Sequence, residues 1–217
     1  MRSPYRRSRT NTLPKVDGNT ARSLGEMRKV FEEENIETEV IQVGSKQIRG
    51  CVACQSCFKT AQCSIDDLVN EVAKKFEECD GMVVGSPVYY ASANGTLTAF
   101  LDRLFYSTRF DKRMKVGASI AVARRGGCSA TFDQLNKYFT ISGMPLASSQ
   151  YWNSVHGSLP GQVEQDLEGL QTMRTLAKIS SCSSQLPDSL DSTTLTQEEL
   201  SQTSLPFFLI QLLRKLS

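Results

Sequence analysis

The sequence predicts an α/β fold built on a doubly wound parallel sheet, in which helices cover both faces of the strands. Helical and extended patterns alternate regularly between Thr20 and Trp152. The stretch Met114–Ala123 is apolar almost throughout, as strands buried on both faces of a sheet are. With 217 residues, 40% of them hydrophobic, the chain is long enough for one domain with a sizeable core.

The first half of the chain carries two helical and two extended patterns. In the first helical pattern, apolar side chains such as Leu24, Met27 and Val30 recur at helical intervals. The extended pattern that follows alternates apolar with polar residues. In chain order, the predicted elements are a helix over Thr20–Glu34, a strand over Glu37–Val43, a helix capped by Ser64 or Asp66 that ends near Cys79, and a short buried strand over Gly81–Gly85.

The second half continues the same alternation. Its predicted elements are a helix over Asn94–Tyr106, a strand over Met114–Ala123, a helix over Thr131–Ser142, a strand over Leu146–Trp152 and an amphipathic helix over Pro160–Ala177. In sheets of this kind ligands bind outside the carboxyl ends of the strands, so the segments that follow the strands are the candidate site.

Four cysteines lie within thirteen residues, in CVACQSCFKTAQC. These residues are Cys51, Cys54, Cys57 and Cys63, and thiolates at such spacing can converge on one metal centre. Zinc usually takes two separated Cys-x2-Cys pairs, whereas three cysteines at successive x2 spacings with a nearby fourth are more typical of an iron–sulfur loop. The order of preference is an iron–sulfur cluster, then zinc, then a thiol/disulfide relay, and scattered structural cysteines are the alternative to all three.

Three loops at predicted strand ends or helix starts are candidate ligand contacts. Gly18, Asn19 and Thr20 open the first helix, where free backbone N–H groups can bind an anion, although a plain N-cap explains Asn19 or Thr20 equally well. Tyr89 and Tyr90 follow a strand and offer aromatic surface for a flat ring, or they pack as ordinary loop tyrosines.

The third loop, Arg124–Gly127 (RRGG), follows the most apolar strand. Gly126 and Gly127 permit close approach of the backbone, and Arg124 and Arg125 supply positive charge. A solvated basic turn is the alternative. The three loops together favour a ligand site more strongly than each does alone, because all of them fall at one edge of the predicted sheet.

Composition excludes several classes of protein. The formal net charge of +2 is too balanced for a dedicated nucleic-acid binder. Seven cysteines, four of them in one ligand-like loop, favour a reducing cytoplasmic setting over a disulfide framework, with Cys79, Cys128 and Cys182 as core or surface thiols. No run of about 20 apolar residues is present, so no membrane span is expected.

Several motifs together resemble the NADPH-dependent FMN reductase family of flavodoxin-like proteins. They are PKVDGNT over Pro14–Thr20, GSPVYYASANGTLTAFLDR over Gly85–Arg103, the ARRGG segment and YWNSVHG over Tyr151–Gly157. The cysteine loop resembles that of the iron–sulfur flavoprotein branch of this family. The resemblance covers roughly Pro14–Ala177.

The resemblance implies a flavin site made of the three loops. The FMN phosphate would lie at Gly18, Asn19 and Thr20, with Lys15 nearby. The isoalloxazine ring would lie against Pro87, Val88, Tyr89, Tyr90 and the loop of Arg124, Arg125, Gly126 and Gly127. The four cysteines would hold a [4Fe–4S] cluster that exchanges electrons with FMN, NAD(P)H would be the electron donor, and the protein would be a homodimer or tetramer.

The resemblance requires no catalytic side chain, because hydride and electron transfer belong to the flavin. His156 could line the site or lie on a surface loop. Two alternatives stay open: a non-catalytic binding module based on zinc or thiols, and a degenerate homologue that no longer binds FMN.

Both ends of the chain depart from the family pattern. Family members have an apolar first strand ending in Gly-Ser-Pro-Arg, whereas residues 1–13 contain four arginines and hardly any apolar run. The first strand is therefore expected to be missing or degenerate, with poor folding and weak FMN binding as consequences. The flavodoxin-like domain is expected to span residues 14–178. Residues 179–217 form a Ser/Thr-rich tail, expected to be disordered, with a short apolar end.

Overall fold

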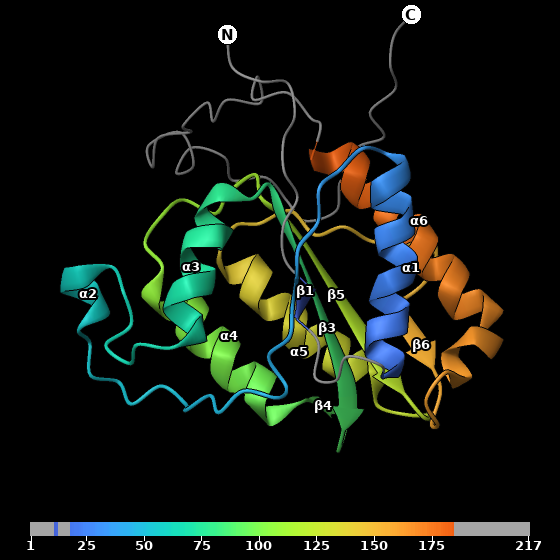
Figure 1. Ribbon diagram of the computed structural model, residues 1–217, viewed down its shortest axis with the longest axis horizontal. Helices are drawn as coiled ribbons and strands as arrows, with labels where there is room; N and C mark the ends of the chain where they lie inside the picture. Colours follow the sequence, from blue (N-terminus) through green and yellow to red (C-terminus); the bar gives the residue numbers. More distant parts are fainter. Residues whose placement is uncertain (1–10, 13–17, 185–217) are drawn as a thin grey trace, which may run out of the picture. The chain divides into compact units, whose positions relative to one another are not determined.

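The computed structural model describes residues 11–12 and 18–184, and within them a mainly parallel sheet has helices on both faces (Figure 1). The strand order is β2-β1-β3-β5-β6, and the short β4 pairs antiparallel with the end of β3. Without β4 this is the flavodoxin-like order 2-1-3-4-5, so the predicted doubly wound fold is confirmed. The strands are β1 (Asn11–Thr12), β2 (Val40–Ile41), β3 (Gly81–Tyr89), β4 (Ser92–Ala93), β5 (Val116–Ala123) and β6 (Ser154–His156).

The helices form two layers. In Figure 1, α1 and α6 lie together beside one face of the sheet, and α3, α4 and α5 lie on the other. None of the described helices is long and apolar enough to cross a membrane. The helices are α1 (Asn19–Glu33), α2 (Cys57–Thr60), α3 (Leu68–Glu78), α4 (Gly95–Ser107), α5 (Cys128–Ile141), the 3-10 helix η1 (Gln162–Gln165) and α6 (Leu167–Ser184).

Alternation along the central strands divides the core into two clusters. In β3, Val83 packs in the cluster that includes α1 and α6, whereas Met82 and Val84 pack in the cluster that includes α3, α4 and α5. In β5, Gly117 and Ser119 face α5: an added Cβ at Gly117 would lie 2.5 Å from the ring of Phe139, and the hydroxyl of Ser119 donates to Oδ1 of Asn136 at 2.6 Å. Both faces of β5 are therefore covered, which explains its nearly continuous apolar sequence.

The first strand is short, yet it occupies the interior of the sheet. Asn11 is paired in parallel with Val40 of β2 and Val83 of β3, and Thr12 follows in the same register. The prediction of a missing or degenerate first strand is therefore confirmed in its second form, because the described part of this strand is two residues long, Asn11 and Thr12. Backbone N–H and C=O groups form the ladder, so even polar residues can pair there. The rest of the predicted basic tail, residues 1–10 and 13, lies outside the described residues.

Three of the predicted boundaries that need correction lie at α3, β6 and α6. Helix α3 begins at Leu68 rather than near Ser64 or Asp66, because the side chain of Asp67 accepts a hydrogen bond from the backbone N–H of Val69 and caps the helix. The strand expected over Leu146–Trp152 lies instead at Ser154–His156, beside the carboxyl end of β5.

The third correction concerns the end of the domain. Helix α6 continues to Ser184, beyond the predicted boundary at residue 178. Ser180 is buried, and its hydroxyl donates to the carbonyl oxygen of Leu176 at 2.8 Å, so the polar composition of this segment is compatible with a helix end. The remainder of the predicted tail, residues 185–217, lies outside the described residues.

Candidate functional site

The three candidate loops meet around one cleft at the carboxyl edge of the sheet. The cleft has a volume of about 390 Å³, within the range of small-molecule sites. A fourth segment, which follows β6, completes the cleft; its lining residues Gly157, Ser158 and Pro160 were not among the predicted site residues. The lining residues are Gly18, Asn19, Thr20, Pro87, Val88, Tyr89, Val122, Arg124, Gly157, Ser158 and Pro160.

The start of α1 forms an anion site at one end of the cleft. Gly18 is the N-cap, no side chain of the described residues caps the helix, and its first turn has no acidic residue. The first backbone N–H groups and the positive end of the helix dipole therefore remain available for an anion. Asn19 is the first helical residue, so the plain N-cap interpretation of Asn19 or Thr20 is wrong.

The side chain of Asn19 connects this helix start to the segment after β6. Its Nδ2 donates to the carbonyl oxygen of Leu159 at 2.9 Å. Its Oδ1 atom is buried without a hydrogen-bond partner among the described residues. A buried acceptor without a donor fits a ligand that carries hydroxyl or N–H groups. Lys15, the other predicted phosphate contact, lies outside the described residues.

The two adjacent tyrosines differ in position. Tyr89 lines the cleft and is 55% exposed, whereas Tyr90 is fully exposed and does not line it. Tyr90 and Ala91 both have positive φ, 52° and 56°, so the chain turns sharply after Tyr89. Only Tyr89 is therefore placed to cover a ring bound in the cleft.

Gly127 lets the arginine loop approach the tyrosine loop closely. Its φ is +89°, and a Cβ there would lie 2.8 Å from the Cα of Ala91 and 2.9 Å from a methyl carbon of Val88. A residue with a side chain could not occupy this position without displacing one of the two loops. Gly127 thus shapes the cleft, but neither Gly126 nor Gly127 is among its lining residues.

A second hollow of about 550 Å³ adjoins the cleft and shares Arg124, Gly157 and Ser158 with it. Arg125 and His156 also line this hollow. The side chain of His156 lies 3.4 Å from Asp166 and 3.9 Å from the sulfur of Cys128. His156 therefore lines a polar annex of the cleft and is not an isolated surface histidine.

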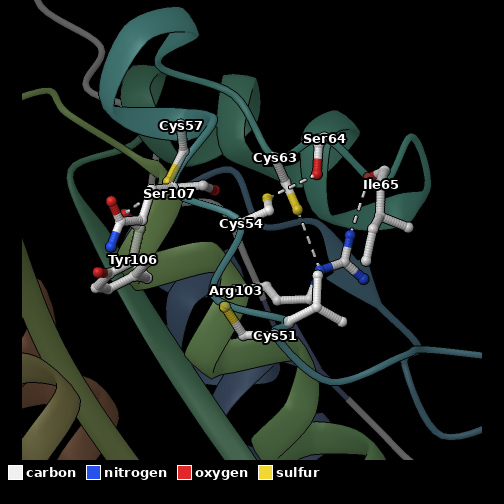
Figure 2. A pocket seen from close by; sticks show the side chains of 11 residues that line it. Cys51, Cys54, Cys57, Cys63, Ser64, Ile65, Arg103, Tyr106 and Ser107 are labelled. Atoms are coloured by element: carbon white, nitrogen blue, oxygen red, sulfur yellow. Dashed lines mark hydrogen bonds between the residues drawn. The ribbon is translucent and has the colours of Figure 1, made fainter.

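The four loop cysteines surround a separate, much smaller pocket (Figure 2). Its volume is about 20 Å³, and Arg103, Tyr106 and Ser107 of α4 form its other wall. All four thiols are free, and among the described residues no group of three or more His, Cys, Asp or Glu side chains is arranged to hold a metal ion. The donor set fits an iron–sulfur cluster, and the sulfurs would have to move closer together to bind one.

The loop backbone and neighbouring polar groups orient the individual sulfurs. Ala53 and Gln55 have positive φ, 52° and 59°, so the chain turns on either side of Cys54. The sulfur of Cys54 lies 3.1 Å from the hydroxyl oxygen of Ser64, and hydrogen bonds with Ser64 and then Ser56 lower the pKa of Cys54 to about 7. Cys54 therefore has the thiolate character that metal ligation requires.

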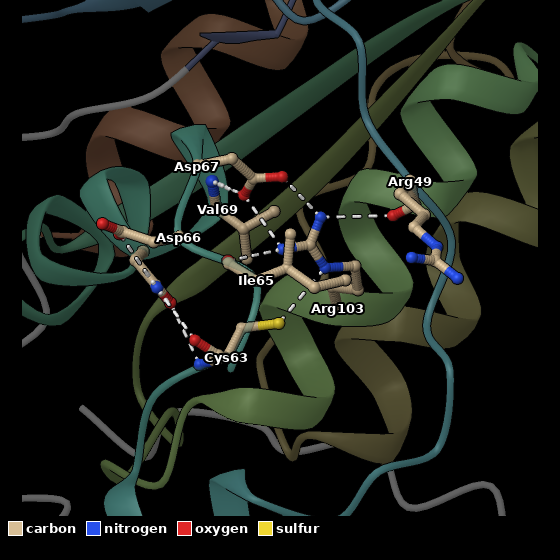
Figure 3. A network of polar contacts seen from close by, with 8 residues as sticks. Arg49, Cys63, Ile65, Asp66, Asp67, Val69 and Arg103 are labelled. Carbon is tan, nitrogen blue, oxygen red and sulfur yellow. Dashed lines mark hydrogen bonds and ion pairs between the residues drawn. The ribbon is translucent and has the colours of Figure 1, made fainter.

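Arg103 is a residue of the cysteine pocket that sequence reasoning missed. It is 1% exposed, and its guanidinium donates to the sulfur of Cys63 at 3.2 Å and to the carboxylate of Asp67 at 2.6 and 2.9 Å (Figure 3). Burial disfavours its charge, but the hydrogen bonds with Asp67 and Cys63 outweigh burial and raise the pKa of Arg103. A lone arginine within the apolar pattern of α4 was the available signal.

The model of the family described as NADPH-dependent FMN reductase matches residues 12–158. This range includes the cysteine loop and every lining residue of the cleft except Pro160. The chain belongs to this family. It is a family of flavoprotein oxidoreductases, and the recognition made from the sequence motifs is confirmed.

Relatives from two archaea are named iron–sulfur flavoproteins. The chain is 35% identical over 173 residues to one from Methanocaldococcus jannaschii, with 76% of this chain and 90% of the relative covered. It is 30% identical over 170 residues to one from Methanosarcina thermophila, with 76% and 87% covered.

Solved structures with the same fold are more distant in sequence. RosB, solved with bound 8-demethyl-8-formylriboflavin-5'-phosphate, superposes with a TM-score of 0.66 at 15% identity, over 98% of this chain and 92% of that one. The NADH:FMN oxidoreductase EMOB superposes with a TM-score of 0.60 at 17% identity, over 87% and 100%. At these identities the likeness shows the fold alone.

Proposed function

We propose that this protein is an FMN-dependent oxidoreductase that takes electrons from NAD(P)H and exchanges them between FMN and a [4Fe–4S] cluster. The observation that carries the proposal is the single cleft in which the start of α1 and the loops after β3, β5 and β6 meet. Membership of the FMN reductase family supports the flavin part of the proposal. The names of the archaeal relatives support the iron–sulfur part.

The cleft divides the binding of FMN between its two ends. The start of α1 at Gly18, Asn19 and Thr20, which no side chain of the described residues caps, fits the phosphate, because free N–H groups and the helix dipole favour an anion. Tyr89 and the backbone of Pro87 and Val88 offer a wall for the isoalloxazine ring. Bound FMN supplies the hydride and electron chemistry, and these residues bind it, orient it and limit its contact with water.

The annex beside the cleft supports a site for the pyridine nucleotide. Arg124 and Arg125 line it, and neither is paired with a carboxylate among the described ion pairs. Guanidinium groups bind phosphate through paired hydrogen bonds, so this hollow suits the phosphates of NAD(P)H. Its position next to the cleft would place the nicotinamide near the flavin.

The cysteine pocket would hold the cluster through Cys51, Cys54, Cys57 and Cys63. Two alternatives make different predictions for metal and flavin content. A zinc- or thiol-based binding module would contain zinc or no metal, and no flavin. A degenerate homologue would contain neither metal nor flavin.

Purification without oxygen, followed by a visible spectrum and by iron, sulfide, zinc and flavin analysis, tests the proposal. We expect flavin absorption together with broad iron–sulfur absorption, and reduction of the flavin by NADH or NADPH in rapid mixing. Zinc without flavin would support the binding module, and a colourless metal-free protein the degenerate homologue.

The cysteine assignment has its own test. Cys57→Ser should lower the iron content and leave the flavin largely in place, since the two sites use different loops. Cys128→Ser is the matched control. Cys128 lies outside the cysteine pocket, so this variant should retain its iron. Equal iron content in Cys57→Ser and the parent chain would contradict the assignment.

A homodimer or tetramer is also proposed. Exposed aromatic side chains support it: Tyr90, Tyr151 and Trp152 are all at least 58% exposed. Sedimentation velocity of the purified protein measures the assembly state, and a monomer at micromolar concentration would contradict this part.

A further inference from the structure

One buried cation connects α4 to the proposed cluster ligands. Arg103 donates from Nε to the sulfur of Cys63 at 3.2 Å, and its other nitrogens bind oxygens of the cysteine loop and its surroundings. A guanidinium that is 1% exposed is rare in a protein interior unless it is paired, and here each of its nitrogens has a partner.

Arg103 holds the cysteine loop at both ends. Its Nη1 donates to the carbonyl oxygen of Arg49 at 3.2 Å, just before Cys51, and its Nη2 donates to the carbonyl oxygen of Ile65 at 2.9 Å, just after Cys63 (Figure 3). The four cysteines lie between these two anchors. Both ends of the loop are therefore held against α4, and they stay held when the sulfurs between them move to bind a cluster.

Asp67 fixes the orientation of the guanidinium. It accepts from both Nη atoms and also caps α3 through the N–H of Val69. With both Nη atoms engaged in this way, Nε is directed at Cys63. A rigid, oriented donor of this kind can control a metal ligand more strongly than a mobile surface charge does.

The sulfurs of the other three loop cysteines have weaker or uncharged hydrogen-bond partners. Cys51 accepts from the backbone N–H of Ala53 at 3.4 Å, and Cys54 is paired with the hydroxyl of Ser64. Cys57 lies 3.8 Å from the carbonyl oxygen of Tyr106, which can only accept. Among the hydrogen bonds of the described residues, only Cys63 has a charged donor.

We propose that Arg103 is a positioning residue whose charged hydrogen bond to Cys63 raises the reduction potential of the cluster. This inference rests on the proposed function, because it requires that the cysteines hold the cluster. Reduction adds an electron to the cluster and its thiolates, and a nearby cation in a low-dielectric site stabilises that added negative charge. The cluster thereby becomes a better electron acceptor.

The test compares three variants of the anaerobically purified holoprotein by redox titration followed by electron paramagnetic resonance. Arg103→Gln combined with Asp67→Asn removes both charges of the pair, so it leaves no unpaired buried charge and retains an oxygen that can cap α3. Arg103→Lys keeps the positive charge and loses the planar set of N–H donors of the guanidinium. Ser64→Ala is the matched control, since it removes a neutral hydrogen bond from a neighbouring sulfur.

We expect the double variant to lower the midpoint potential by at least the equivalent of a tenfold change in the ratio of oxidised to reduced cluster, about 59 mV for one electron. Arg103→Lys should lie between it and the parent, Ser64→Ala should shift less than the double variant, and the flavin midpoint should stay unchanged in all three. If the double variant retains no cluster, the comparison of Arg103→Lys with the parent decides.

Unchanged cluster potentials in iron-loaded variants would overturn this inference and leave the proposed function intact. A shift in Ser64→Ala as large as that in the double variant would also overturn it, because the charge would then have no special effect. A parent chain that takes up no iron on reconstitution would overturn the proposed cluster and this inference together.

Discussion

The cleft and the cysteine pocket are built in opposite ways. The cleft combines segments from across the chain: one hydrogen bond beside it joins Asn19 and Leu159, which are 140 residues apart. The cysteine pocket takes its thiols from thirteen consecutive residues and its fixed wall from one helix. The cleft is also far larger, about 390 Å³ against about 20 Å³.

This difference predicts how each region responds to substitution. Each loop of the cleft contributes separately, so single substitutions there should have modest effects. The contacts that anchor the cysteine loop converge on Arg103, so a substitution at that residue should have a large effect.

The largest effect is expected for Arg103→Met in the metal-free chain. The change leaves Asp67 without its cation, and losing one partner of a buried ion pair costs about 3–5 kcal/mol in the free energy of unfolding. Arg109→Met is the control, because Arg109 is exposed and contacts only the face of Phe58 in the described ring contacts, worth about 0.5–1 kcal/mol. Urea unfolding measures both, and equal losses would contradict the comparison.

A stronger first strand should stabilise the sheet beside the cleft. The two-residue β1 lies between β2 and β3, so replacing residues 1–13 with an apolar strand ending in Gly-Ser-Pro-Arg should bury one or two more side chains. We expect a gain of about 2–4 kcal/mol in the free energy of unfolding, and tighter FMN binding. A replacement of equal length made of Ser and Lys is the control. The argument fails if both replacements unfold at the same urea concentration.

Gly127→Ala should disturb the contact between two loops of the cleft. A Cβ at φ +89° is strained and would meet Ala91 at 2.8 Å, so we expect a loss of about 1–2 kcal/mol in the free energy of unfolding. Gly126→Ala is the matched control, because nothing lies within 4 Å of its added Cβ. Thermal unfolding of both variants checks the prediction, which a harmless Gly127→Ala would contradict.

The smallest effect concerns the two tyrosines. Tyr89→Ala should weaken FMN binding by about 1 kcal/mol, roughly a fivefold rise in the dissociation constant, because an aromatic contact with the ring is lost. Tyr90→Ala should bind FMN like the parent, since Tyr90 is fully exposed outside the cleft. Flavin titration measures both affinities. A larger effect from Tyr90→Ala would place the ring elsewhere.

Local patterns in the sequence were sufficient for the types of most elements and for naming the candidate thiol ligands. The apolar spacing of α1 and the continuous apolar run of β5 follow from helical and strand periodicity, which operate over a few residues. The cysteine loop is contiguous, so its four members could be named together. The start of α3 was missed because two further residues, Ser64 and Asp66, can cap a helix as Asp67 does.

Only the tertiary structure decided which distant residues meet. Arg103 lies 40 residues from Cys63 and 36 from Asp67, and no local periodicity relates positions so far apart. Positive φ at Tyr90 separates it from Tyr89, a distinction that two identical neighbouring side chains cannot show in the sequence. The interior place of β1 likewise depends on backbone pairing with β2 and β3, which is independent of the side-chain polarity that the sequence displays.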